Sequence, residues 1–287
     1  MFCIFLRIYS TFDADCAQRP FLVQMRLRYW CSAQVVAKNP CSRLRTSTLH
    51  IKSGATLKML YLIVQMGILS LLAATTAWAD MNLGETAYVT GDYETAFQEL
   101  QPHAMEGNAR AQFIVGRMYA NGTAVNQSDT EAIRWYELAA QQGFYLAQYS
   151  LASMYFYGYG IEQSYKEAVY WWHKAAEQGH PDAQARLGYI YRGGKAAEKD
   201  ETEAAKWFRM AATQGHMDAQ QNLGLMYAKG QGVPQDYISA YVWWSRARKQ
   251  GSKKAESNLV MLKPLMSQEE VSVARQKISE GQQPAVE

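Results

Sequence analysis

The chain has 287 residues, of which 48% are apolar and 19% are charged, as in ordinary globular proteins. Its formal net charge of +3 divides unevenly, because residues 1–58 carry nine basic and two acidic residues (+7) and residues 59–287 carry 20 basic and 24 acidic residues (−4). All four cysteines precede residue 59. A mildly acidic body without cysteine argues against general nucleic-acid binding, thiolate metal sites and a disulfide scaffold.

Residues 1–58 show no sustained helical or strand period, which buried elements need. We interpret them as an upstream leader that is non-native or disordered, with Met59 as the biological start. A real, unusually long basic leader is the competing interpretation. The arginine-rich, acid-poor start also leaves an organellar transit peptide open.

Residues 59–79 form an uncharged apolar run that ends in Ala77-Trp78-Ala79, the small-x-small pattern of a signal peptidase site. We therefore expect cleavage after Ala79 and export, in a bacterium to the periplasm. An uncleaved membrane anchor is the alternative, because about 20 uncharged residues can span a bilayer.

Residues 80–107 are predicted to form N-terminal capping helices. Ala96 and Gly107 keep the phase of the repeat that follows, but Glu99 occupies the place of its tryptophan. A terminal unit with a polar outer face is typical of repeat proteins, which need such caps to stay soluble.

Residues 108–251 contain four units with a period of 36 residues and no insertion or deletion. One column holds only tryptophan, namely Trp135, Trp171, Trp207 and Trp243. A glycine column keeps the same step, namely Gly143, Gly179, Gly215 and Gly251. Because chance would not preserve the phase through four tryptophans, the repeat is a strong signal.

Each unit is predicted to be two antiparallel helices, A and B. In the first unit, apolar residues at 111, 115, 118 and 119 and again at 132, 135, 136 and 139 have the spacing of a helix face. A glycine follows helix A, and a serine or aspartate precedes helix B as its expected N-cap. The predicted N-caps are Ser128, Ser164, Asp200 and Asp236.

The middle of helix A holds glycine in three units, although glycine costs about 1 kcal/mol relative to alanine there. We expect the aromatic pair of helix B, such as Trp207 and Phe208, to approach this backbone closely. One helical hairpin cannot bury both aromatics, so the units must stack into a solenoid.

Residues 252–287 are predicted to form C-terminal capping helices and a tail. Ala255 opens a last helix A, Pro264 ends it, and Ser267 with Glu270 forms a capping box for one more helix.

The pattern A-x3-LG-x2-Y-x2-G-x-G-V, followed by A-x2-WW-x2-A and QG, resembles the Sel1-like repeat family, which is related to the tetratricopeptide repeats. The most similar stretches are 147–179 and 219–251. Departures are modest: "GTA" at 122–124 and "GKA" at 194–196 replace Gly-x-Gly, and Ala152 replaces the glycine of helix A. The resemblance implies an all-α, right-handed α-solenoid of antiparallel helix pairs.

The resemblance also implies a non-catalytic scaffold or adaptor that binds a partner protein or peptide. Some family members are linked to β-lactam or peptidoglycan chemistry, which leaves a cell-wall enzyme or glycan-binding protein as the alternative. Those relatives are rich in regularly spaced disulfides, whereas residues 59–287 contain no cysteine.

The residues themselves suggest no catalytic centre, metal site or cofactor. His180 and His216 occupy one repeat column at the start of helix A, where N-capping explains them. No His-x3-His or clustered Asp/His spacing is present, and the Gly-x-Gly loops join helices at a fixed phase, unlike phosphate loops, which follow a strand.

A binding surface is expected where the columns vary, because a solenoid needs similar core positions and only a soluble surface. On the exposed side of helix A, expected to line the concave face, the varying columns contain aromatic and arginine residues of the kind that anchor interfaces. The predicted partner-binding residues are Phe113, Arg117, Tyr149, Arg186, Tyr189 and Leu225.

Overall fold

The computed structural model describes residues 62, 64–67, 80–194 and 196–281. The chain divides into two compact units, 1–75 and 76–287, and each is considered by itself. The predictions for residues 1–58, most of those for the apolar segment at 59–79, and the end of the tail lie outside the described residues. None of the helices in the described part is both long enough and apolar enough to cross a membrane.

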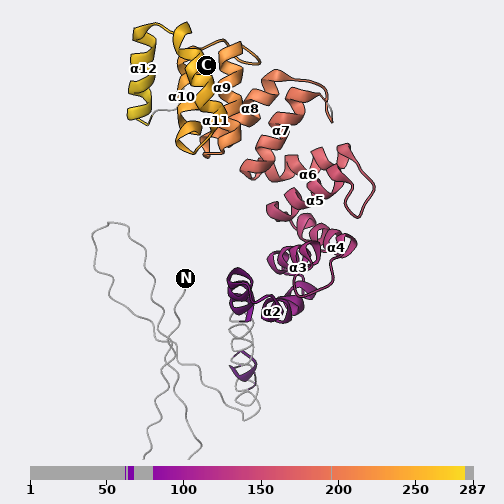
Figure 1. Cartoon of the computed structure of the whole chain (residues 1–287). Coiled ribbons are helices and arrows are strands. Elements are labelled where there is room, and N and C mark those ends of the chain that lie inside the picture. The colour runs from indigo at the N-terminus through magenta and orange to yellow at the C-terminus, as the bar shows by residue number, and fades with distance from the viewer. Residues whose placement is uncertain (1–61, 63, 68–79, 195, 282–287) are drawn as a thin grey trace, which may run out of the picture. The chain divides into compact units, whose positions relative to one another are not determined.

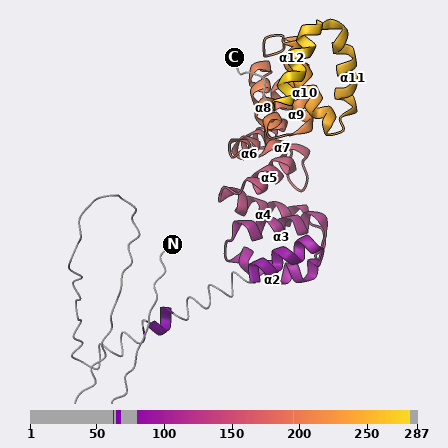
Figure 2. The ribbon, with the colours of Figure 1, turned by 90° about the vertical axis from the view of Figure 1, so that its left-hand side faces the viewer.

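The second unit is built from helices that follow one another in chain order, with no strand among the described residues (Figure 1, Figure 2). Residues 80–90 are helical. The elements after them are α2 (Tyr93–Met105), α3 (Ala109–Asn121), α4 (Asp129–Gln141), α5 (Tyr145–Tyr157), α6 (Tyr165–Glu177), α7 (Pro181–Gly193), α8 (Glu201–Thr213), α9 (Met217–Lys229), α10 (Tyr237–Lys249), α11 (Lys253–Leu262), the 3₁₀ helix η1 (Lys263–Leu265) and α12 (Gln268–Ser279). Helix A of the four units is therefore α3, α5, α7 and α9, and helix B is α4, α6, α8 and α10.

The ends of these helices follow from local side-chain chemistry. Each helix B begins at the predicted N-cap, as where Ser128 Oγ accepts a hydrogen bond from the Glu131 backbone N–H at 3.2 Å. Each helix A ends at a glycine with φ between 66° and 73°, a conformation that glycine adopts without steric cost. The helix boundaries are thus determined within each unit.

Within a unit, helix A packs closely against the aromatics of helix B, as predicted. A Cβ atom at Gly116 would lie 2.8 Å from the ring of Tyr136, and one at Gly188 would lie 2.7 Å from the ring of Phe208. The unit with Ala152 places its fully buried Trp172 in the same cluster as that alanine. Small residues in helix A therefore admit the large residues of helix B.

Between units, glutamines form a repeated hydrogen-bonded bridge. The side-chain amide of Gln112 donates to the carbonyl of Ala104 at 3.1 Å and accepts from Gln142 Nε2 at 2.8 Å. This satisfies a carbonyl that the end of the preceding helix leaves without an intrahelical partner. Equivalent pairs with the same spacing are Gln148 with Gln178, Gln184 with Gln214, and Gln220 with Gln250.

The tryptophan column is not buried uniformly. Trp135 and Trp207 are 6% exposed and Trp243 is 1% exposed, but Trp171 is only partly buried, and its neighbour Trp172 is the 1% exposed residue of that helix. A column that holds only tryptophan predicts equal burial of its four members, and this prediction is wrong for Trp171. In α4 and α8 the residue before the tryptophan places a cationic group over its ring, whereas Tyr170 meets Trp171 edge to face at 5.1 Å.

The C-terminal elements agree with the sequence pattern. Helix α11 ends at Leu262, just before a 3₁₀ turn that contains Pro264. Ser267 and Glu270 form the reciprocal capping box of α12, with hydrogen bonds of 2.7 Å and 3.2 Å. Helix α12 packs against α10, so the last repeat is followed by further helices that cover it.

Candidate functional site

The predicted partner-binding residues lie on helix A of all four units, and the structure separates them into different environments. Arg117, Arg186 and Tyr189 are exposed, whereas Tyr149 and Leu225 are half-buried. Phe113 is buried, with 7% of its surface exposed. Helix α7 contacts α9, helix A of the next unit, so these two units can contribute to one surface.

Phe113 corrects the prediction that its column is exposed. Its ring lies 5.3 Å from the ring of Phe144 and 5.9 Å from that of Tyr136, measured between centroids. Phe144 is the N-cap residue of the next helix A, and its ring packs against that of Phe113. Ala185, in the same column, is also buried, because this part of helix A faces the following unit.

Arg117 lies beside Tyr88 and Phe113, and Leu225 lies in another part of the core. The guanidinium carbon of Arg117 is 5.5 Å from the centroid of Tyr88 and 5.7 Å from that of Phe113, distances typical of cation–π contacts. Leu225 packs against the C-terminal core cluster. These two side chains therefore interact chiefly within the solenoid.

The structure brings together Arg186, Tyr149, Tyr157 and Tyr189, which we call the Arg186 cluster. The hydroxyls of Tyr149 and Tyr157 on α5 and of Tyr189 on α7 act on the guanidinium of Arg186, which is also on α7. Burial lowers the pKa of Arg186, but these hydroxyls, Tyr149 most strongly, outweigh it, so the pKa is raised overall. The cluster holds a permanent positive charge among tyrosine hydroxyls.

Aromatic contacts fix two of these tyrosines. The ring of Tyr149 stacks on the imidazole of His180, with centroids 4.7 Å apart and planes 15° apart. The ring of Tyr157 stacks on Tyr159 at 5.4 Å and meets Phe156 edge to face at 5.0 Å. Because these rings are already held, little side-chain freedom would be lost when a ligand binds.

Tyr189 is fixed from the next unit. Asn222 Nδ2 of α9 donates a hydrogen bond to Tyr189 Oη at 2.8 Å, and Arg192 donates to Asn222 Oδ1. Burial first, and then the charge of Asp218, raise the pKa of Tyr189, so its hydroxyl is protonated at neutral pH. Since that oxygen accepts from Asn222, its proton is available for another acceptor.

Tyr157 and Arg192 were not among the residues predicted from the sequence. A signal was present, because the column of Tyr157 holds Asn121, Gly193 and Lys229 in the other units. A column that changes this much is not needed by the repeat. Its closeness to Arg186, however, depends on how α5 and α7 stack.

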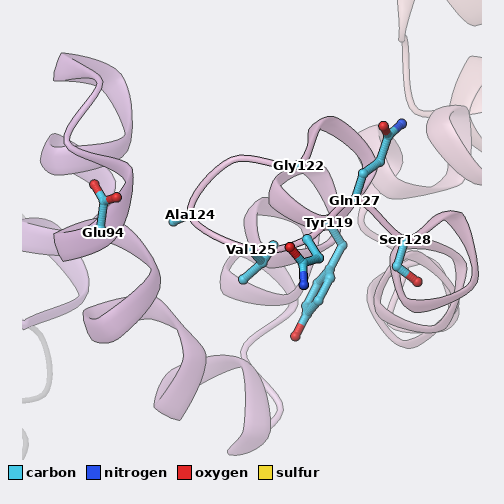
Figure 3. Close-up of a pocket in the computed structure, with 8 residues that line it drawn as sticks. Glu94, Tyr119, Gly122, Ala124, Val125, Gln127 and Ser128 are labelled. Atoms are coloured by element: carbon cyan, nitrogen blue, oxygen red, sulfur yellow. The ribbon is translucent and has the colours of Figure 1, made fainter.

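A separate hollow of about 780 Å³ lies between α2 and the loop that joins α3 to α4. In Figure 3, Ala124 lies on the side of this loop that faces the helix carrying Glu94. Gly160 occupies the same column one unit later, and a Cβ atom there would lie 2.5 Å from Asp129 Cβ. The loop with Gly160 thus lies directly on the preceding helix B, whereas the methyl group of Ala124 is too large for that approach.

The histidines have structural partners. Nδ1 of His180 and Nδ1 of His216 each accept a backbone hydrogen bond at 3.2 Å, which confirms both as N-caps. His173 Nε2 lies 2.9 Å from Tyr191 Oη, and burial lowers the pKa of both His173 and His180. In the part of the chain that the structure describes, no three His, Cys, Asp or Glu side chains are arranged to hold a metal.

Stacked helix pairs joined by glutamine bridges define a helical-repeat solenoid, and comparison with known proteins identifies its family. The model of the Sel1 repeat matches residues 109–144, 146–180, 181–216 and 218–252. The chain belongs to the Sel1 repeat family. Proteins of this family are generally scaffolds for protein interactions and are typically non-catalytic.

Two solved structures illustrate the similarity. A Sel1 repeat protein from Oxalobacter formigenes is 35% identical, with a TM-score of 0.60 over 62% of this chain and 74% of that chain. A protective antigen of uropathogenic Escherichia coli strains that displays an SLR fold is 32% identical, with a TM-score of 0.64 over 73% of this chain and 47% of that chain. The present chain thus spans about half the length of the antigen. The comparison with curated proteins gave no match.

Proposed function

We propose that this chain is a non-catalytic scaffold of the bacterial cell envelope that binds a partner protein or peptide on the exposed side of helix A. The supporting observation is the contrast between columns. Columns that form the core hold similar apolar or aromatic residues in every unit, whereas exposed and half-buried positions of helix A hold arginine or tyrosine in some units and serine, leucine or glutamine in others. Tyrosine and arginine at such positions are the residues that most often anchor interfaces.

Location in the envelope is supported by the sequence at 59–79. The apolar run and the Ala77-Trp78-Ala79 pattern favour export with removal of the segment. The mass of the protein purified from its own host tests this, with Asp80 expected as the first residue. Recovery in the cytoplasmic fraction with residues 59–79 retained would contradict the proposal, and retention in the membrane fraction would indicate the anchored form.

Site-directed photo-crosslinking in the host tests the binding face. A photoreactive phenylalanine analogue replaces Tyr145 on α5 or, as the matched control, Tyr170 on α6 of the full chain. The two tyrosines belong to the same unit and are 40% and 50% exposed, but they lie on helix A and helix B respectively.

We expect a discrete adduct from position 145 and none from position 170, with the crosslinked protein identified by mass spectrometry. Specific binding on helix A predicts this asymmetry, because both positions sample the same compartment. Equal adducts at the two positions would indicate collision, and adducts only at position 170 would place binding on helix B. Either result would reject the proposed face.

A further inference from the structure

Helix α11 exposes a side that is buried in the helix A of all four units. In those units one column holds small, buried residues on which helix B packs, namely Gly116, Ala152, Gly188 and Gly224. Val260 is the next member of this column, and 67% of its surface is exposed. Helix α12 follows α11 in the chain but packs against α10, so it does not cover Val260 as a helix B would (Figure 2).

Val260 belongs to a larger apolar surface at the end of α11. Met261 is the next residue, and Leu265 follows it by four residues in the 3₁₀ turn η1; both are exposed to a similar extent. We call these three residues the α11 patch. Exposed apolar groups that lie close together mark interaction sites. The same segment has three exposed lysines that belong to none of the ion pairs among the described residues, namely Lys253, Lys254 and Lys263.

Charge is concentrated at the two ends of the repeat region. Residues 80–107 carry six acidic residues and no lysine or arginine (−6), whereas residues 246–265 carry six basic residues and one acidic residue (+5). Residues 108–245 between them are nearly balanced, with 12 basic and 13 acidic residues. Residues 266–281, which include α12, add two basic and three acidic residues. The N-terminal end and the segment that holds α11 are therefore complementary in charge.

The N-terminal end also has an uncovered apolar surface. On the helix at 80–90, Gly84 packs against Leu100 of α2, whereas 83% of the surface of Val89 is exposed. After Asp80, the exposed residues of this helix are all uncharged, namely Asn82, Leu83, Thr86, Val89 and Thr90. Helix α2 adds the exposed carboxylate of Glu94 in its first turn and that of Glu106 at its C-cap.

We propose that the C-terminal end of the repeat region, through the α11 patch and its lysines, binds the acidic N-terminal end of a second copy of this chain. This contact goes beyond the proposed partner binding, because it uses the ends of the repeat region in place of the exposed side of helix A in the four units. Burial of the apolar residues stabilises the contact, and the opposite charges select the unlike end.

The contact joins two different surfaces, so it is heterologous. Each bound chain keeps one free end of each kind, and further copies can be added. An anionic lipid surface would account for the α11 patch and its lysines alone. A second copy accounts for the uncovered apolar surface and the concentrated charge at both ends.

Sedimentation velocity of the full chain, as its host processes it, tests the contact over a series of protein concentrations. We expect the native chain to form species larger than a dimer as the concentration rises. The same series at high salt should show weaker association, because salt shortens the range of charge interactions.

Charge reversal tests each end separately. Lys253→Glu with Lys254→Glu reverses the C-terminal end, and Glu94→Lys with Glu106→Lys reverses the N-terminal end. Each pair of changes should weaken self-association by at least about tenfold, because it places like charges across the contact. A chain with both pairs should associate again, because its two ends are once more opposite in charge. Circular dichroism checks that each variant is folded.

Two matched controls separate the ends from the rest of the surface. Glu162→Lys with Glu177→Lys makes the same change in net charge at exposed positions between the ends and should leave self-association unchanged. Met261→Gln keeps the size of the side chain but makes the α11 patch more polar, so it should weaken association severalfold. Met210→Gln, at an exposed position of α8, should have no effect.

A native chain that stays monomeric throughout the concentration series would overturn the inference. Association that survives the changes at Glu94 and Glu106 would indicate contact between two C-terminal ends and would also overturn it. The same holds if the chain with both ends reversed is folded but does not associate. Binding to phosphatidylglycerol vesicles without self-association, lost when Lys253 and Lys254 are reversed, would assign the α11 patch to a lipid surface instead.

Discussion

At the scale of single residues, burial distinguishes the two aromatics of helix B in α6, whereas both are buried in α4, α8 and α10. Trp172 is almost fully buried, in a cluster with Ala152 and Leu187, whereas Trp171 beside it keeps contact with solvent. Both occupy the aromatic pair of the repeat, so their columns alone do not rank them. Replacement by alanine should lower the free energy of unfolding more for the side chain with the smaller exposed fraction.

Trp172→Ala is expected to lower the free energy of unfolding by about 3–5 kcal/mol, the usual range for a large buried aromatic. Trp171→Ala should cost clearly less, because water already reaches part of its ring. Urea denaturation followed by circular dichroism measures both. Equal losses would mean that the two rings share the core equally, against the burial described above.

Ala124 shows a different residue-scale effect, namely backbone strain. Its φ of 62° lies in the left-handed region, where an L-residue with a Cβ atom pays about 1–2 kcal/mol. Ala124→Gly should therefore raise stability by about 0.5–1 kcal/mol after the added chain entropy of glycine is subtracted. Ala120→Gly, inside α3, is the control and should lower stability by about 1 kcal/mol. Thermal melts in which both variants move the same way would contradict a strained Ala124.

At the scale of elements, close packing of helix A on helix B explains why glycine persists in mid-helix. In α7, Gly188 faces the ring of Phe208, whereas a Cβ at Gly193 in the last turn would meet nothing within 4 Å. The same helix thus contains one glycine that packing requires and one that it does not. Substitution by alanine at Gly193 changes helix propensity alone, whereas at Gly188 it changes both helix propensity and packing.

Gly188→Ala is expected to destabilise the chain by about 1–3 kcal/mol, because overpacking against the Phe208 ring exceeds the gain in helix propensity. Gly193→Ala should be neutral or stabilising by up to about 1 kcal/mol. Chemical denaturation of the two variants gives the comparison directly. A stabilising Gly188→Ala would show that the ring of Phe208 can move to admit a methyl group.

The elements that could be predicted from sequence are those whose causes are local. Capping serines, terminal glycines and the position of Pro264 act within one turn, so the helix boundaries followed from the pattern. The burial of Phe113 could not be predicted in this way, because the residue that covers it, Phe144, begins the next unit. The Arg186 cluster could not be predicted for the same reason, because its members come from three different turns of α5 and α7.

The glutamine bridges could be predicted from the sequence only in part. The sequence shows the glutamines at a constant spacing, as in Gln112 and Gln142, but not the carbonyl of Ala104 that they satisfy. Their geometry requires the end of one helix B, the next helix A and the following helix B together. A period reveals which positions matter, and only the stacked units reveal what those positions do.

At the scale of the whole repeat region, the buried side chains form a series of clusters in place of one central core. One cluster spans the helix at 80–90 to α5, a second spans α5 to α8, and a third spans α7 to α12. Each unit contacts mainly its chain neighbours. Stability should therefore be approximately a sum of unit and nearest-neighbour terms, as in other solenoids.

Local damage should consequently remain local. Leu100 of α2 and Leu259 of α11 are both buried, with 0% and 3% of their surfaces exposed, and they belong to the first and third clusters. Replacing either leucine by alanine should lower the free energy of unfolding by about 2–5 kcal/mol. In native-state hydrogen exchange, Leu100→Ala is expected to speed amide exchange in α2 and α3 far more than in α10 and α11. Leu259→Ala should do the reverse. The reason is that one end of a linear array of repeats can open while the other end stays folded. Uniform acceleration in both variants would instead mean that the repeats unfold as a single cooperative unit, in which case the proposed binding face on helix A could not loosen in one unit while the others stay folded.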